Sequence, residues 1–241
     1  MDALTLPADR CETTRLAAYP VSPECRAAFD AAEHVLIGLS PGNSYYSSEE
    51  RIHRFAQWAS QRFATLHFSV WGEPFVWSLL AVGFPADKAE RYARTSARKL
   101  LNKAGRALAA VGVADPESRI LTWPKLQQNP AFRHALAEVR ARYQADAWFR
   151  EACLEVCRDY LGSQPLVGDR PLAERTGHAV EYYLSELPLF VDTPALVGAD
   201  SSVYCYHAIN PFEQRLYQRS LPLLPAVGQG RLVLVDETAP A

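Results

Sequence analysis

A serine at the end of an apolar run is the first candidate for chemistry in this sequence. Ser40 lies in the segment Gly38-Leu39-Ser40-Pro41-Gly42, which follows the apolar stretch 34–39 directly. A short apolar run that ends in glycine and proline turn residues is typical of a buried strand. A serine just past such a strand can act as a covalent nucleophile if a neighbouring group activates it. The structural alternative is a Ser-Pro turn that leads into a helix.

The same turn fits G-x-S-x-G, the nucleophile elbow of α/β-hydrolases. In those enzymes the backbone N–H of the residue after the serine stabilises the oxyanion, and here that residue is Pro41, which has no N–H. The serine also follows the first predicted strand, whereas a hydrolase elbow is expected after several strands. A serine hydrolase or acyltransferase therefore remains the second interpretation.

Two pairs of polar side chains lie in the second half of the chain. Tyr182 and Glu186 are four residues apart, so they project from one face of a helix. A carboxylate beside a phenol can hold a protonated α-amino group and later accept its proton. An acid near a helix C-terminus opposes the macrodipole, which disfavours a purely structural role for Glu186. The second pair, Tyr206 and His207, follows a predicted strand, and its structural alternatives are a packed aromatic and a loop histidine.

A group of cations lies between residues 91 and 112, in a segment with no acid. On a helix these six side chains fall within about half of the circumference. The whole chain has a net charge of −2, so such a group makes a local positive patch. We expect it to contact nucleic-acid phosphates, and the alternative is a solvated face. The six cations are Arg91, Arg94, Arg98, Lys99, Lys103 and Arg106.

The elements that position these residues follow from apolar periodicity and turn signals. The predicted strands are 34–39, 65–70, 119–123, 203–206 and 231–235. The predicted helices are 47–62, a long region to about 111 with a break at 83–85, 129–143, 145–161 and 171–187. Ser47 with Glu50 is expected to cap the first helix, and Pro188 to end the last.

This alternation predicts an α/β fold, a Rossmann-like parallel sheet of about five strands with helices on both faces. Ligands of such sheets bind outside the carboxyl ends of the strands, where Ser40 and Tyr206 are predicted to lie. At 241 residues the chain is expected to form one domain, 1–241, with 1–30 as a peripheral N-terminal segment.

The composition limits location and cofactors. No apolar run is long enough to span a bilayer and the N-terminal residues do not form a secretory signal, so we expect a cytoplasmic protein without membrane contact. The five cysteines form no zinc pattern, although Cys153 and Cys157 share a helix face, and no metal is expected. No P-loop is present, and neither ATP nor another cofactor is predicted. We expect a monomer.

Taken together, the motifs resemble the cyclodipeptide synthases. In that family an asparagine follows a strand-end serine after three residues, a Tyr-x-x-x-Glu-Leu-Pro segment closes a helix, and a Tyr-His pair comes after the next strand. The matching residues here are Ser40, Asn43, Tyr182, Glu186, Tyr206 and His207. Asn43, Tyr206 and His207 look like the subfamily named for its Asn-Tyr-His trio. The resemblance covers nearly the whole chain.

The resemblance implies a fold similar to the catalytic domains of class I tyrosyl- and tryptophanyl-tRNA synthetases. It implies two aminoacyl-tRNAs as substrates and a ping-pong route to a cyclic dipeptide through aminoacyl and dipeptidyl esters of the serine. Tyr182 and Glu186 would hold the first amino group, and the basic helix would bind tRNA. Leu36 and Gly38 would line the first side-chain pocket. A non-catalytic RNA-binding module on the same fold is the third interpretation.

In the family that the sequence resembles, the asparagine and the Tyr-His pair assist the serine. Asn43 and Tyr206 would position the acyl group and relay protons. His207 would support Tyr206 and take no direct part in the chemistry.

Overall fold

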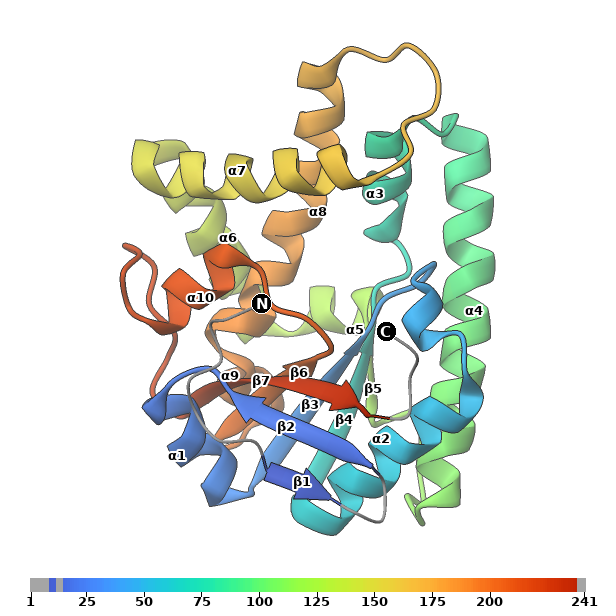
Figure 1. Ribbon diagram of the computed structural model, residues 1–241, viewed down its shortest axis with the longest axis vertical. Helices are drawn as coiled ribbons and strands as arrows, with labels where there is room; N and C mark the ends of the chain where they lie inside the picture. Colours follow the sequence, from blue (N-terminus) through green and yellow to red (C-terminus); the bar gives the residue numbers. More distant parts are fainter. Residues whose placement is uncertain (1–8, 12–14, 238–241) are drawn as a thin grey trace.

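The computed structural model describes residues 9–11 and 15–237. Within these ranges seven strands form one sheet in the order β1-β2-β7-β6-β3-β4-β5 (Figure 1). The strands are β1 (Asp9–Cys11), β2 (Leu16–Pro20), β3 (His34–Leu39), β4 (Thr65–Val70), β5 (Ile120–Thr122), β6 (Ser202–Tyr206) and β7 (Gln229–Asp236). The five strands from β7 to β5 pair in parallel. They confirm the predicted Rossmann-like parallel sheet of about five strands.

The two N-terminal strands are an addition that the sequence did not predict. β2 pairs antiparallel with β7, and β1 pairs antiparallel with β2. Leu16, Ala17 and Ala18 are fully buried, so the part of segment 1–30 that contains β2 belongs to the sheet and is not peripheral. The reason is the open edge of β7, whose N–H and C=O groups need partners.

Helices cover both faces of the sheet, as predicted. They are α1 (Pro23–Ala31), α2 (Glu49–Arg62), α3 (Phe75–Val82), α4 (Ala86–Ala110), α5 (Trp123–Gln128), α6 (Pro130–Ala145), α7 (Ala147–Ser163), α8 (Leu172–Val191), α9 (Thr193–Val197) and α10 (Pro211–Tyr217), with a 3-10 turn η1 (Ser44–Tyr46). Val35 and Ile37 pack into an apolar core with α2 and α4, whereas Leu36 packs on the other face with α6 and α8. The strand residues are thus buried on both sides, as expected for a parallel sheet.

Two helix boundaries differ from the prediction. Ser48, and not Ser47, caps α2, because its side chain accepts the N–H of Arg51 at 3.2 Å. α8 does not end at Pro188 and continues to Val191. The proline removes one intrahelical hydrogen bond, but Leu189 is fully buried in the last turn and its packing outweighs that loss.

Other local predictions are confirmed. Asn129 caps α6 by accepting the N–H of Phe132 at 3.2 Å. α3 and α4 are separated at Gly83, whose φ of 106° is accessible to glycine without strain. Among the described residues, no helix combines the length and the apolar character that a membrane crossing requires.

Candidate active site

A cavity of about 720 Å³ lies at the carboxyl ends of β3 and β6 and extends between α3, α7 and α8. Five of the predicted catalytic residues border it: Ser40, Asn43, Tyr182, Glu186 and Tyr206. They come from two strand ends and one helix that are far apart in the sequence. The fold therefore brings the three predicted motifs to one place, at the position where parallel α/β sheets bind ligands.

The contact between Ser40 and Tyr206 follows from strand pairing. β3 and β6 are parallel neighbours with Ile37 opposite Cys205, so the residues after their ends lie side by side. The Oγ of Ser40 is 2.8 Å from the hydroxyl oxygen of Tyr206, and either group can donate. Asn43 donates its Nδ2–H to the same Tyr206 oxygen at 3.5 Å.

The orientation of the Asn43 amide is fixed locally. Its Oδ1 accepts the N–H of Tyr45 at 2.9 Å, which caps the η1 turn. The Nδ2 group therefore points to Tyr206. Burial raises the pKa of Tyr206 to about 12, and the hydrogen bond with Ser40 opposes that rise. Tyr206 is consequently a neutral phenol at physiological pH. It can relay a proton, but it is not present as a phenolate that could act as a base.

Tyr182 and Glu186 lie on the face of α8 that borders the cavity. The Tyr182 hydroxyl donates to Oε1 of Glu186 at 2.8 Å, as expected for side chains one helical turn apart. Burial raises the pKa of Glu186 to about 8. The hydrogen bond from Tyr182 opposes this rise, the negative Glu213 adds to it, and the positive Arg231 reduces it. A carboxyl group with this pKa can exchange a proton with an amine near neutral pH.

His207 is held away from Ser40 by its own contacts. Its Nδ1 lies 2.9 Å from the Tyr46 hydroxyl, and its ring stacks on Tyr45 with centroids 4.3 Å apart. Its ring also touches the Tyr206 ring, with a centroid distance of 4.4 Å. Burial and the charges of Arg231 and Arg51 lower the pKa of His207 to about 4. The imidazole is thus neutral, and its ring packs against the Tyr206 ring at an interplanar angle of 51°.

The two residues predicted to line the first side-chain pocket do not border the cavity. Leu36 is fully buried in the apolar core between the sheet and α8. Gly38 lies beneath two tyrosines: a Cβ there would be 2.2 Å from the Tyr204 hydroxyl and 3.3 Å from Cδ2 of Tyr206. Tyr204 thus fills the space above Gly38 and itself borders the cavity.

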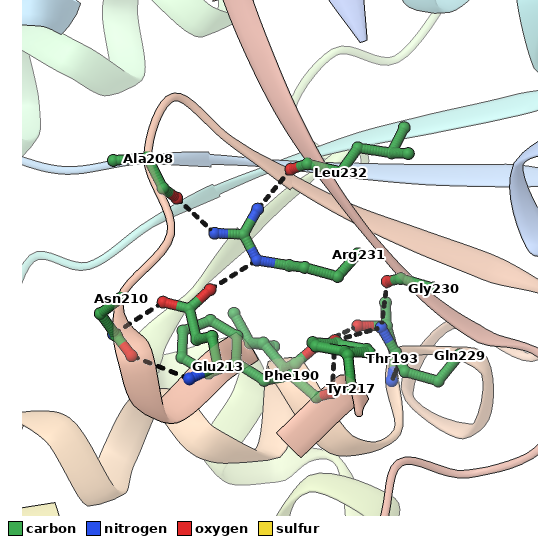
Figure 2. Close-up of polar contacts among 11 residues, drawn as sticks. Phe190, Thr193, Ala208, Asn210, Glu213, Tyr217, Gln229, Gly230, Arg231 and Leu232 are labelled. Carbon is green, nitrogen blue, oxygen red and sulfur yellow. Dashed lines mark hydrogen bonds and ion pairs between the residues drawn. The ribbon is translucent and has the colours of Figure 1, made fainter. Parts of the chain in front are cut away.

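A buried ion pair that the sequence motifs did not indicate lies at the same cavity. Arg231 of β7 donates its Nε–H to Oε2 of Glu213 at 2.6 Å, and the two residues are 0% and 5% exposed (Figure 2). Both border the cavity. An arginine inside an apolar strand pattern was the available signal, since a charge in a buried strand needs a partner.

The structure separates the six predicted phosphate ligands into two groups. Arg91, Arg94, Arg98 and Lys99 are exposed on α4, which runs along one side of the molecule, and they form no ion pair with a residue that the structure describes (Figure 1). Lys103 donates to the backbone carbonyl of Ser47. Lys103 therefore has a partner within the protein.

Arg106 is the second cation with a partner in the protein. It forms two hydrogen bonds with the Glu49 carboxylate, at 2.6 and 2.8 Å. The reason is the packing of α2 against α4, which places Glu49 of the first turn of α2 beside Arg106. The sequence pattern showed no acid within the helix, but an acid from a neighbouring helix supplies the pair.

The described residues contain no group of three or more His, Cys, Asp or Glu side chains that could hold a metal ion. Cys153 and Cys157 are free thiols buried in the core around α7. Burial raises the pKa of Cys157 to about 12, so the thiol stays protonated. These two residues pack as small apolar side chains.

The fold is a parallel α/β sheet covered by helices, with a cavity at the carboxyl ends of its central strands. The sequence model of the family described as "Cyclodipeptide synthase" matches residues 16–236. The chain therefore belongs to the cyclodipeptide synthase family.

Relatives of known activity agree with this assignment. The chain is 32% identical over 202 residues to the cyclo(L-leucyl-L-phenylalanyl) synthase of Streptomyces noursei, covering 84% of each chain. It is 30% identical over 224 residues to the cyclo(L-tyrosyl-L-tyrosyl) synthase of Mycobacterium tuberculosis, covering 92% of this chain and 76% of the relative.

Solved structures agree as well. A Mycobacterium tuberculosis protein described as showing that cyclodipeptide synthetases are related to type I tRNA synthetases superposes with a TM-score of 0.84 at 27% identity, over 96% of this chain and 97% of that one. A cyclodipeptide synthase from Bacillus thermoamylovorans superposes with a TM-score of 0.82 at 26% identity, over 92% and 96%.

Proposed function

We propose that this protein makes a cyclic dipeptide from two aminoacyl-tRNAs through covalent esters of Ser40. The observation that carries the proposal is the 2.8 Å contact between Ser40 Oγ and the Tyr206 hydroxyl in the cavity that Glu186 also borders. A hydroxyl nucleophile, a proton relay and a group that handles amines are the parts that this reaction needs. The cavity volume of about 720 Å³ is within the range of small-molecule sites.

The first step forms an aminoacyl ester. Ser40 Oγ attacks the ester carbonyl of the first aminoacyl-tRNA and gives its proton to Tyr206. Tyr206 passes its own proton to the departing ribose oxygen of the tRNA, so the phenol is neutral before and after the step. The high pKa of Tyr206 favours this concerted relay, because a free phenolate would be rare at physiological pH. Asn43 keeps the Tyr206 oxygen in place.

The next steps build and close the ring. The amine of the second aminoacyl-tRNA attacks the Ser40 ester, so a peptide bond forms, the bond to Ser40 Oγ breaks, and the dipeptide is carried by the second tRNA. Ser40 Oγ then attacks the ester that joins this dipeptide to the tRNA, which forms the dipeptidyl ester of Ser40 and releases the second tRNA. The first amine then attacks the remaining ester carbonyl, the second peptide bond forms, and Ser40 regains its proton. Each attacking amine must lose a proton, and Glu186, with a pKa of about 8, is suited to accept it. Tyr182 would hold the same carboxylate in place.

A simple serine hydrolase fits the arrangement less well. Pro41 cannot donate a backbone N–H to an oxyanion. His207, the histidine nearest in sequence to Tyr206, contacts Tyr46 through Nδ1 and does not contact Ser40 in the structure. The serine therefore meets a phenol in the place where a hydrolase uses an imidazole.

The exposed cations of α4 support tRNA as the carrier of the amino acids. Arg91, Arg94, Arg98 and Lys99 present four positive charges on a chain whose net charge is −2. Arg94 and Arg98 also border a second hollow of about 500 Å³ at the ends of β4 and β5. Such charges position a nucleic acid by its phosphates. An enzyme that uses aminoacyl-tRNAs would work in the cytoplasm, and we expect it to act as a monomer.

The proposal is tested by expressing the chain in bacteria and searching the medium for diketopiperazines by mass spectrometry. Wild type and Ser44→Ala should release the same cyclic dipeptide, whereas Ser40→Ala should release none. Ser44 is a suitable control because it also borders the cavity. Equal amounts from wild type and Ser40→Ala would refute the role of the serine.

A further inference from the structure

Arg231 is a charged side chain with no exposed surface, and its surroundings account for that. It lies on β7 opposite Tyr204 of β6, and its guanidinium is 5.2 Å from the Tyr204 ring. A buried charge is costly unless it is paired and hydrogen bonded. Arg231 meets this condition through three acceptors: Glu213 Oε2 at 2.6 Å, the carbonyl of Ala208 at 2.6 Å, and the carbonyl of Leu232.

The acceptors come from three parts of the fold (Figure 2). Ala208 is two residues past Tyr206, in the segment that joins β6 to α10. Glu213 lies in the first turn of α10, where Asn210 accepts its N–H at 2.9 Å and donates to its Oε1 at 2.8 Å. One guanidinium therefore connects β7, the segment 207–210 and the start of α10.

This tie bears on the contact between Tyr206 and Ser40. Tyr206 is the last residue of β6, so the direction of its side chain depends on how the chain leaves the strand. Arg231 fixes the chain just after β6 through its hydrogen bond to the Ala208 carbonyl. A lysine at position 231 would keep the charge but could not reach Glu213 and Ala208 with the same planar fork.

The pair also lies beside the carboxyl group of Glu186. Glu213 raises the pKa of Glu186 and Arg231 lowers it, so the two members act in opposite directions on the same group. The titratable and charged groups around Glu186 are Tyr182 on α8, Tyr160 on α7, Tyr204 and Tyr206 on β6, Glu213 on α10 and Arg231 on β7. Glu213 and Arg231 are the ion pair in this set.

We propose that Arg231, held by Glu213, is a positioning residue of the synthase: it fixes the segment after β6 so that Tyr206 meets Ser40, and it balances the charge of Glu213 beside Glu186. The inference rests on the proposed function. It adds a role for two residues that do not themselves touch the reacting atoms.

The first test separates position from charge. Arg231→Lys should lower the rate of Ser40 acylation by aminoacyl-tRNA by about tenfold to 100-fold, because a small displacement of a reacting group is enough for such a loss. The half-saturating concentration of aminoacyl-tRNA should stay near that of wild type, since the exposed cations of α4 are unchanged. Arg215→Lys is the matched control, because Arg215 pairs with Glu155 at 2.8 Å on the surface of α10.

The second test uses the opposite signs of the two charges. The rate of product formation should rise with pH as Glu186 loses its proton. Glu213→Gln should move the midpoint of that rise to lower pH, and Arg231→Gln should move it to higher pH, each by about half a pH unit. Glu155→Gln, which removes a surface carboxylate, should leave the midpoint unchanged.

A merely structural pair would give a different result, namely slower variants and lower melting temperatures with no opposite shifts. Midpoints that stay fixed or move in the same direction, or a folded Arg231→Lys variant with the wild-type rate, would overturn the inference. If Arg231→Gln does not fold, Glu213→Gln decides by its sign: a shift to lower pH supports the inference, and any other result rejects it. A wild type that makes no product would reject the proposed function and this inference together, whereas an active wild type with unshifted variants would reject the inference alone.

Discussion

Replacing Glu186 with glutamine should stabilise the protein at alkaline pH and at the same time lower its activity. Glutamine keeps the shape of the side chain, and its amide oxygen can still accept the hydrogen bond that Tyr182 donates at 2.8 Å. What the change removes is a negative charge inside the cavity. Activity should fall by about 100-fold, the usual loss when a group that accepts protons is removed.

The size of the stability effect follows from the pKa of Glu186. Burial raises it from an ordinary value of 4.5 to about 8. At 1.36 kcal/mol per pH unit this change corresponds to an upper limit of roughly 5 kcal/mol. The carboxyl group borders a cavity that water can enter, so we expect about 2 to 3 kcal/mol after screening.

The sign follows from proton binding. An unfolded chain loses the Glu186 proton near pH 4.5, and the folded chain keeps it until about pH 8. Between these values the folded state holds more protons, so this group makes wild type less stable as the pH rises. The glutamine variant has no such proton, and its advantage in the free energy of unfolding should grow from pH 5 to pH 8 and then level off.

Urea unfolding at pH 5, 7 and 9 measures the difference directly. Glu181→Gln is the matched control, because Glu181 is exposed on the same helix and should follow wild type at each pH. If the free energies of unfolding of Glu186→Gln and wild type differed by the same amount at the three pH values, Glu186 would not be a buried carboxyl group with a raised pKa.

Two further predictions concern the relay and the tRNA contact. Tyr206→Phe removes the hydroxyl 2.8 Å from Ser40 Oγ and should slow acylation by about 100-fold in single-turnover assays with aminoacyl-tRNA, while a rate equal to wild type would exclude the relay. Paired Arg98→Glu and Lys99→Glu should raise the Michaelis constant for aminoacyl-tRNA strongly and reduce its salt dependence, yet leave acylation by a small activated ester unchanged. Arg106→Gln, which breaks only a surface ion pair, should change neither, and equal losses on both substrates in the paired variant would point to a damaged fold.

Much of the parallel sheet could be predicted because its signals are local. The strands at His34–Leu39 and Thr65–Val70 have the bounds that apolar runs and turn residues indicated. The helix predicted from residue 129 also begins there, with Asn129 as its cap. β2 could not be predicted, because Leu-Ala-Ala-Tyr-Pro has little strand character and becomes a strand only through the open edge of β7.

The residues of the candidate site that belong to sequence motifs could be predicted. Ser40, Tyr182 and Glu186 were identified by spacing, and the structure brings them to one cavity. Tyr204 and Arg231 were not predicted. Tyr204 has the pattern of an ordinary aromatic residue in a strand. Glu213, the partner of Arg231, is 18 residues away in the sequence and lies on a different element. Pairs of this kind depend on which elements the fold brings together, and the spacing of residues in the sequence does not show that.

The central claim is that Ser40 carries the amino acid, and one measurement tests it directly. Purified protein is mixed with an aminoacyl-tRNA, quenched in acid, and analysed by intact-protein mass spectrometry followed by peptide mapping. We predict an added mass of one aminoacyl group on the peptide that contains Ser40 in wild type and in Ser44→Ala, and none in Ser40→Ala. An adduct of the same mass in Ser40→Ala, or an adduct that maps to another residue in wild type, would contradict the account.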